Sequence, residues 1–216
     1  MLFLNKYKKE DFKNVYFISG TATGGKTTIS KEISKKYGFL RYDVDVEFDR
    51  HLQMSNPINQ PYMNKKFKNA NDFFMRDQDE YVNWLENNSY EQLEFVFEDL
   101  IKLSKNQKIV CDLHLLPEDI KGLIDYNKIV FLIRENNDNL IDDYCNREDH
   151  KDFYNYINSA TNVELAKENC NNVLKKLNKK RCEIIKNSGF LYIERNQFST
   201  INKTLEIIEK HFNLCK

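Results

Sequence analysis

The amino-acid sequence predicts a three-layer α/β fold, in which helices cover both faces of a central parallel sheet of about five strands. Short apolar runs typical of buried strands alternate along the chain with segments of helical periodicity. A glycine-rich turn follows the first of these runs, and 216 residues are enough for one medium-sized domain. We therefore expect a single domain over residues 1–216, with its ligand crevice at the carboxyl ends of the strands.

Five short runs rich in β-branched and aromatic residues are the expected strands. They lie at residues 15–18, 39–42, 108–111, 128–133 and 190–193. Four helices are expected where apolar residues recur every three or four positions, at residues 27–37, 90–104, 163–187 and 200–212. Gly38 directly after the first helix is a typical stop signal.

Two segments interrupt the alternation of strands and helices. Residues 57–88 are polar and rich in aromatic side chains, and we interpret them as an insertion that covers the substrate. Residues 135–158 are highly charged and are interpreted as a lid. Both segments would extend the same domain, since no repeat or low-complexity linker separates them from the strands.

Composition excludes several classes of protein. The 33 basic residues balance the 33 acidic ones, so no overall positive charge attracts nucleic acid or an anionic membrane. The chain has no apolar stretch near the ~20 residues of a membrane span, and its first apolar run is too short for a signal peptide. Five cysteines without C-x-x-C spacing indicate a reducing compartment. We expect a cytoplasmic monomer or homodimer that binds a small molecule.

The strongest motif is the G-x-x-x-x-G-K-[ST] pattern, which lies between the first strand and the first helix, as a P-loop requires. Its residues are Gly20, Thr21, Ala22, Thr23, Gly24, Gly25, Lys26 and Thr27. Glycines let backbone N–H groups wrap a phosphate, and the positive end of the helix adds to the attraction. The motif therefore predicts a nucleotide site within a P-loop NTPase fold.

Three side chains at the end of this loop have expected roles. The Lys26 ammonium would bridge the β- and γ-phosphates of ATP, and the Thr27 hydroxyl would bind Mg²⁺. Thr28 is either an ordinary helical residue or a second hydroxyl that contacts the α-phosphate.

Acidic residues follow the second and third strands. Asp43 and Asp45 lie on the same side of the chain, so one could hold hydrated Mg²⁺ while the other orients or deprotonates the acceptor hydroxyl. Solvated acids or a helix N-cap are the alternatives. Asp112 ends the third strand and is a further candidate metal ligand, or the cap of the following turn.

The phosphate loop, its helix and the run Tyr42-Asp43-Val44-Asp45 together resemble the shikimate and gluconate kinase group of the nucleoside monophosphate kinase-like family. This resemblance implies a five-stranded parallel sheet, ATP with Mg²⁺, and transfer of the γ-phosphoryl group to a small acceptor. It also implies that Asp43 contacts the hydrated metal and Asp45 the substrate hydroxyl. The sequence departs from shikimate kinases at residues 110–114, which replace a glycine triplet.

Three arginines and one histidine complete the candidate site. Arg147 lies where related kinases have lid arginines that close over the transferring phosphate, although an exposed ion pair is the alternative. Arg134, directly after the fourth strand, is the other candidate for that role or for substrate binding. Arg76 could bind an acidic acceptor, and His114 could contact the substrate.

The sequence thus predicts an ATP-dependent phosphotransferase that acts on a hydroxyl or phosphate of a small metabolite. A nucleoside or nucleotide kinase, in which the aromatic insertion stacks a base, is the closest alternative. A regulatory switch that binds a nucleotide and hydrolyses it slowly is the alternative from another class of protein.

Overall fold

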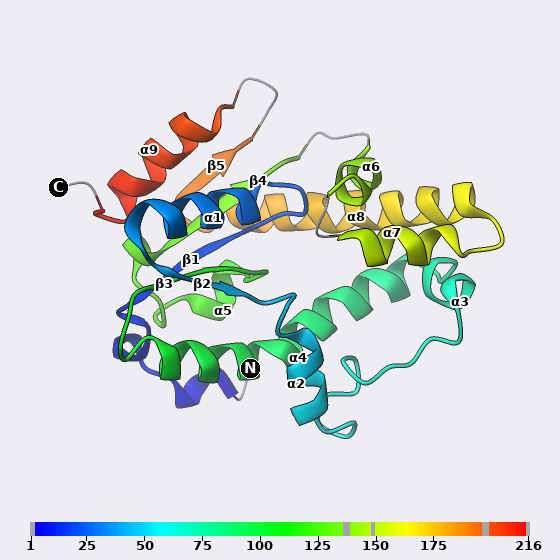
Figure 1. The fold of residues 1–216 in the computed structure, drawn as a ribbon, viewed down its shortest axis with the longest axis horizontal. Helices are drawn as coiled ribbons and strands as arrows, with labels where there is room; N and C mark the ends of the chain where they lie inside the picture. Colours follow the sequence, from blue (N-terminus) through cyan, green and yellow to red (C-terminus); the bar gives the residue numbers. More distant parts are fainter. Residues whose placement is uncertain (1–2, 136–138, 148–149, 196–198, 215–216) are drawn as a thin grey trace.

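The computed structural model describes residues 3–135, 139–147, 150–195 and 199–214. Its centre is a five-stranded parallel sheet with the strand order β2-β3-β1-β4-β5 (Figure 1). The strands are β1 (Val15–Gly20), β2 (Leu40–Asp43), β3 (Ile109–Asp112), β4 (Ile129–Ile133) and β5 (Tyr192–Glu194). All five predicted strands are confirmed, with ends that differ by one or two residues.

The register of the sheet brings the predicted site residues to one edge. Asp43 of β2 pairs with Asp112 of β3, and Asp112 also pairs with Ile18 of β1. Gly20, the first residue of the phosphate loop, pairs with Leu132 of β4. Because all strands run in the same direction, the two aspartates and the loop meet at the carboxyl end of the sheet.

Two helices cover one face of the sheet, namely α1 (Lys26–Tyr37) and α9 (Ile201–His211). Ile29 and Ile33 of α1 pack there with Ile208 of α9 and with the strand side chains that point to this face of the sheet. Gly38 ends α1 in the left-handed conformation, as its position in the sequence predicts.

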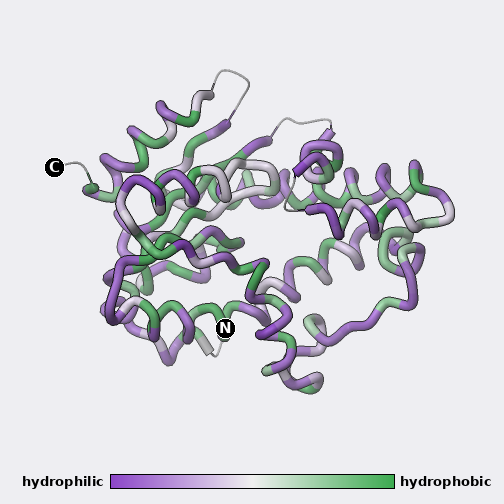
Figure 2. The backbone as a smooth tube through the Cα atoms, viewed as in Figure 1, coloured by the Kyte–Doolittle hydropathy of each residue, from purple (hydrophilic) through white to green (hydrophobic). Residues whose placement is uncertain are grey.

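The opposite face is covered by the C-terminal halves of two long helices, α4 (Gln78–Leu103) and α8 (Val163–Lys186). The short helix α5 (Pro117–Ile120) packs into the same core. Figure 2 shows hydrophobic residues concentrated along the strands, whereas the segment between α2 (Phe48–Met54) and α3 (Ala70–Phe74) is mostly hydrophilic.

The N-terminal halves of α4 and α8 extend beyond the sheet and form a helical lobe. Their partners are α3 (Ala70–Phe74), α6 (Leu140–Cys145) and α7 (Lys151–Asn158), all of which contact α8 (Figure 1). A separate apolar cluster, which includes Phe74, Tyr81, Ile157 and Val173, holds this lobe together. The interpretation of residues 57–88 as a substrate cover and of residues 135–158 as a lid remains a proposal, and residues 136–138 and 148–149 lie outside the described part.

Helix α4 begins twelve residues before the expected start at Tyr90. The Asp77 side chain caps it by accepting hydrogen bonds from the backbone N–H groups of Asp79 and Glu80. Its first half faces the lobe and not the sheet. Four polar residues at positions 86–89 separate the apolar residues of the two halves, which explains why periodicity located only the second half.

The remaining elements are short. Helix α2 (Phe48–Met54) follows β2, and 3₁₀ turns lie at η1 (Phe3–Lys6), η2 (Lys9–Phe12) and η3 (Tyr126–Lys128). Among the described residues, no helix has the length and apolar character needed to cross a membrane.

Candidate functional site

The phosphate loop connects β1 to α1 and depends on its three glycines. Gly20 and Gly25 have φ angles of 131° and 89°, which residues other than glycine rarely adopt. A Cβ atom at Gly20 or Gly24 would overlap the carbonyl oxygen of Leu132, and one at Gly25 would overlap the guanidinium of Arg195. The loop therefore lies directly against β4, with its N–H groups at the start of α1.

Lys26 folds back into this loop. Its ammonium donates a hydrogen bond to the Thr21 carbonyl oxygen at 2.8 Å. Burial, followed by the positive charge of Arg181, lowers the pKa of Lys26 to about 7, although the negative charges of Asp112 and Asp45 oppose this effect. A phosphate group at the loop would supply the negative charge that favours the ammonium form.

Asp112 is the centre of a hydrogen-bond cluster beside the loop. One of its carboxylate oxygens accepts from the Thr27 hydroxyl at 2.8 Å, and the other accepts from the Ser30 hydroxyl at 2.7 Å. Arg41 of β2 donates to Ser30 at 3.0 Å and contacts Asp112 at 3.3 Å. Sequence reasoning missed Ser30 and Arg41, because neither belongs to a recognised motif.

Arg41 also joins the two strand-end aspartates. Its guanidinium lies 2.7 Å from an Asp43 carboxylate oxygen and pairs with Asp112 on the neighbouring strand. One cation thus compensates two carboxylates that the sheet register places side by side. The Thr27 hydroxyl and these carboxylates form an oxygen-only donor set, which is the chemistry that Mg²⁺ prefers.

Asp45 lies close to Asp43, whose carboxylate accepts a hydrogen bond from the Asp45 backbone N–H at 3.2 Å. Part of the Asp45 side chain is exposed to a pocket beside the phosphate loop, but the other residues that line this pocket exclude much of the surrounding solvent. This burial, followed by the negative charges of Asp43 and Asp112, raises the pKa of Asp45 above its ordinary value.

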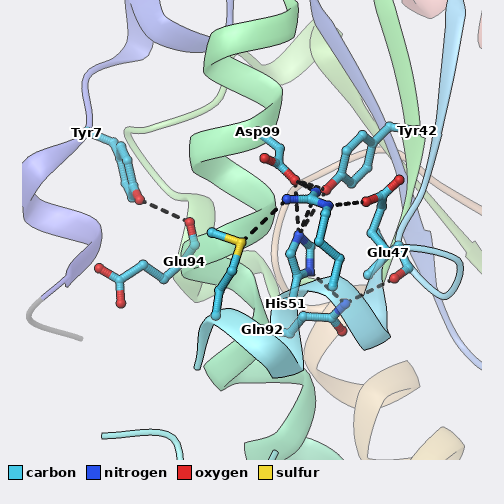
Figure 3. A network of polar contacts seen from close by, with 10 residues as sticks. Tyr7, Tyr42, Glu47, His51, Gln92, Glu94 and Asp99 are labelled. Atoms are coloured by element: carbon cyan, nitrogen blue, oxygen red, sulfur yellow. Dashed lines mark hydrogen bonds and ion pairs between the residues drawn. The ribbon is translucent and has the colours of Figure 1, made fainter. Parts of the chain in front are cut away.

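A buried polar network fixes the turn that carries Asp43 and Asp45 (Figure 3). The Tyr42 hydroxyl donates to Asp99 at 2.6 Å, and the ring of the fully buried His51 also contacts Asp99. Gln92 of α4 donates to the carbonyl oxygen of Val44, which lies between the two aspartates, at 3.0 Å. The network therefore attaches the turn to both α2 and α4.

Glu47, His51 and Asp99 of this network are close enough together to ligate a metal ion. However, the Arg50 guanidinium donates hydrogen bonds to both Glu47 and Asp99. None of Glu47, His51 and Asp99 is among the described residues that line the pockets at the phosphate loop, and we interpret the cluster as a structural anchor.

Two pockets meet at the phosphate loop. The larger has a volume of about 930 Å³ and extends along α1 past Thr28 and Lys31. The smaller has a volume of about 130 Å³ and contains Asp45, Asp112 and His114. Four residues line both pockets, namely Thr23, Lys26, Thr27 and Arg147.

The predicted arginines lie in three different places. Arg147 contacts the Thr27 hydroxyl at 3.4 Å, where the two pockets meet. Arg134 lines the larger pocket; its backbone N–H donates to the Thr21 hydroxyl, and its guanidinium pairs with Asp143 at 2.7 Å. Arg76 lies in the helical lobe.

Aromatic rings surround the Arg76 guanidinium at centroid distances of 4.1–4.8 Å. These rings belong to Phe67, Phe73, Tyr81 and Trp84. The arrangement is typical of a cation–π cluster that stabilises packing. Both terminal nitrogens of the Arg76 guanidinium are buried without a hydrogen-bond partner, and the role of Arg76 as an acceptor contact stays a prediction.

Helix α8 supplies two site residues that sequence reasoning missed. The amide oxygen of the buried Asn178 accepts a hydrogen bond from the Ala22 N–H at 2.9 Å, and its amide nitrogen donates to the Ala22 carbonyl oxygen at 3.2 Å. One turn later, Arg181 donates to the ring of His114, which also lies 3.3 Å from the Gly20 carbonyl oxygen. No motif marks these positions, since both lie more than 150 residues after the loop.

No protein-family model matches the sequence, and no curated protein sequence matches it. Solved structures do match. Shikimate kinase from Acinetobacter baumannii in complex with shikimate has a TM-score of 0.52 and 15% identity, and the match covers 95% of this chain and 98% of that chain. It confirms the expected three-layer α/β fold of P-loop kinases.

Two further kinases align less closely. Deoxyadenosine kinase from M. mycoides has a TM-score of 0.45 at 16% identity, over 93% of this chain and 100% of that one. Dephospho-CoA kinase from Campylobacter jejuni has a TM-score of 0.43 at 15% identity, over 93% and 96%.

Proposed function

We propose that the protein is an ATP-dependent phosphotransferase that moves the γ-phosphoryl group to a hydroxyl or phosphate of a small molecule. The observation that carries this proposal is the meeting of two pockets at Lys26, Thr27 and Arg147. One pocket has the volume and positive lining for a nucleoside triphosphate, and the other is small and contains a carboxylate. A phosphoryl group could pass between them at that point.

The larger pocket suits the triphosphate because backbone N–H groups of the loop and several cations line it. Lys26, Lys31, Arg134 and Lys151 contribute positive charge. Phosphoryl transfer needs mainly positioning and charge stabilisation, and both are properties of this pocket. ATP is the donor that the resemblance to small-molecule kinases favours.

Magnesium fits the oxygen donors beside the loop. Thr27 and Asp112 would hold the ion, because their side-chain oxygens lie 2.8 Å apart, and Asp43 would contact it from the neighbouring strand, where it pairs with Asp112. When bound, Mg²⁺ would neutralise charge on the β- and γ-phosphates. Arg41 would keep both carboxylates in place, since it pairs with each of them.

The acceptor would lie in the smaller pocket, beside Asp45. The Asp45 carboxylate would accept a hydrogen bond from the acceptor hydroxyl. The raised pKa of Asp45 makes this carboxylate a stronger base than an ordinary aspartate. Arg147 would stabilise the negative charge that spreads over the transferring phosphoryl oxygens. Its contact with Thr27 places it at the boundary that the phosphoryl group must cross.

Formation of ADP from Mg-ATP, measured with a panel of nucleosides, sugar acids, polyols and aromatic alcohols, tests the proposal. We expect one acceptor class to increase ADP formation in the wild type, with no increase in the Lys26→Ala variant. Nucleotide binding without stimulation by any acceptor would favour the regulatory switch. Stimulation by nucleosides alone would assign the protein to the nucleoside kinases.

A further inference from the structure

The Asp45 carboxylate depends on its own backbone for its position. Within the described part of the chain, no hydrogen bond or ion pair holds this carboxylate, whereas the Arg41 guanidinium holds the carboxylate of Asp43 at 2.7 Å. The negative charge of Asp43 also repels that of Asp45. A side chain in this situation lies where the neighbouring peptide groups direct it.

The peptide group between Val44 and Asp45 is held at both ends. Its carbonyl oxygen accepts a hydrogen bond from the side-chain nitrogen of Gln92 at 3.0 Å, and its N–H donates to the Asp43 carboxylate at 3.2 Å. Because a peptide group is planar, these two contacts together fix the plane from which the Asp45 side chain extends. Gln92 is therefore the residue of α4 that orients this peptide group.

The Gln92 amide is itself held in one orientation (Figure 3). The residue is only 7% exposed, and its side-chain nitrogen lies 3.1 Å from Nδ1 of His51. Since the Val44 carbonyl oxygen can only accept, the amide atom that faces it is the nitrogen, and the second N–H of this nitrogen donates to Nδ1. The other ring nitrogen of His51, Nε2, donates to Asp99 at 3.0 Å. The buried ring thus holds Gln92, and Gln92 holds the peptide group.

Gln92 is also the point at which this network reaches the proposed acceptor site. It lines the smaller pocket together with Asp45, whereas His51 and Asp99 are not among the described residues that line it. Neither Gln92 nor Asp45 is among the described residues that line the larger pocket, where the nucleotide would lie. A loss of the Gln92 contact should therefore disturb the acceptor side of the reaction and leave the nucleotide side unchanged.

We propose that Gln92 is a positioning residue for Asp45, which holds the Asp45 carboxylate at the acceptor hydroxyl through the peptide group between Val44 and Asp45. This inference rests on the proposed function. Phosphoryl transfer depends on the placement of the reacting groups, and a displacement of about 1 Å can cost about a hundredfold in rate. Without the amide donor, this peptide group would keep its contact with Asp43 alone and could rotate about it.

The Gln92→Met variant tests the proposal, because Met has a similar length and no hydrogen-bond donor. With the acceptor that gives the highest rate of ADP formation in the wild type, we expect kcat to fall at least about thirtyfold. The calorimetric Kd of Mg-ATP should change less than about threefold. Equal kcat of this variant and the wild type contradicts the proposal, as does an equally large loss of Mg-ATP affinity.

A double-mutant cycle with Asp45→Ala separates positioning from a general structural effect. Once the Asp45 carboxylate is absent, Gln92 has nothing to position, so that Gln92→Met should lower kcat less than about threefold further. A loss as large as in the wild-type background would show that Gln92 does not act through Asp45. The Gln92→Asn variant keeps an amide that is one methylene too short for both contacts, and it should also lower kcat, so that the test does not depend on the folding of one variant.

Hydrogen–deuterium exchange measures the hold on the turn without catalysis. In Gln92→Met, the backbone N–H groups of residues 44–47 should exchange at least about tenfold faster than in the wild type. Unchanged exchange of these groups overturns the proposal. If no acceptor stimulates ADP formation in the wild type, the proposed function and this inference both fail, whereas an active wild type with an equally active Gln92→Met refutes only this inference.

Asn14→Leu is the matched control. The Asn14 side-chain nitrogen donates to the carbonyl oxygen of Ser104 at 2.9 Å, at the C-terminal cap of α4, so this substitution also removes an amide donor to a backbone carbonyl of a distant segment. We expect a lower melting temperature and a kcat within about twofold of the wild type. A fall in kcat as large as that of Gln92→Met would show that loss of stability alone explains the effect, and would contradict the proposal.

Discussion

Replacement of Lys26 by Met should stabilise the protein while it removes the charge that the proposed reaction needs. Burial and the positive charge of Arg181 disfavour the ammonium group, so that the pKa of Lys26 is about 7 in the folded chain. One hydrogen bond, to the Thr21 carbonyl oxygen, opposes this effect. Met has a similar length and no charge, and we therefore expect Lys26→Met to unfold at a higher temperature at pH 7 when no nucleotide is added.

The magnitude follows from the lowered pKa. A change from the ordinary 10.5 to about 7 corresponds to at most about 5 kcal/mol of unfolding free energy. The lost hydrogen bond to Thr21 removes about 1 kcal/mol, and partial solvent access of the side chain roughly halves the remainder. A net gain of about 2 kcal/mol would raise the melting temperature of a chain of this size by about 4–8 °C.

The gain should depend on pH. Between pH 7 and 10.5 the unfolded chain keeps the Lys26 proton while the folded chain releases it, so the stability of the wild type rises with pH in this range. The advantage of Lys26→Met is therefore fully present below pH 7 and should fall by more than half at pH 9. Differential scanning calorimetry at the two pH values measures it.

Lys35→Met is the matched control, because Lys35 is an exposed residue of the same helix. We expect this variant to differ from wild type by no more than about 0.5 kcal/mol at either pH. A Lys26→Met variant that is no more stable than wild type at pH 7 would refute the reasoning, as would a gain that does not decrease at pH 9.

Three further substitutions test the site. Asp45→Asn should lower kcat at least about hundredfold and change the calorimetric Kd of Mg-ATP less than about threefold, since Asp45 would face the acceptor in the proposed site; unchanged kcat would remove its role. Asn178→Leu should leave the Ala22 N–H unpaired, destabilise the chain by about 1–3 kcal/mol in urea unfolding and raise the KM for ATP; wild-type values of both would show that the loop does not need this anchor. Arg147→Gln should lower kcat at least about hundredfold with a nearly unchanged melting temperature; a loss of stability alone would make Arg147 structural.

The strands and the phosphate loop could be predicted from the sequence because their signals are local. Five apolar runs and one motif gave all the strands and the position of the loop. The register then placed Asp43 beside Asp112, as expected for parallel strands that end at the same edge. Arg147 could be located near Thr27 only by resemblance, since nothing in its own neighbourhood marks the contact.

The parts that the sequence did not predict depend on contacts between distant segments. Asn178 and Arg181 are single polar residues within a long helix, and only the packing of α8 against the loop gives them a role. Arg76 has the charge of a substrate contact, but four aromatic rings surround it in three dimensions. The first half of α4 was missed because four polar residues, at positions 86–89, separate its apolar residues from those of the second half.

Isothermal titration calorimetry of Mg-ATP with wild type and with Lys26→Met tests the central claim most directly, because every proposed role depends on a triphosphate at the loop. We predict one binding site in the wild type and at least about a tenfold loss of affinity in the variant, although the variant is the more stable protein. Absence of binding to the wild type, or equal affinity of the two proteins, would contradict the account.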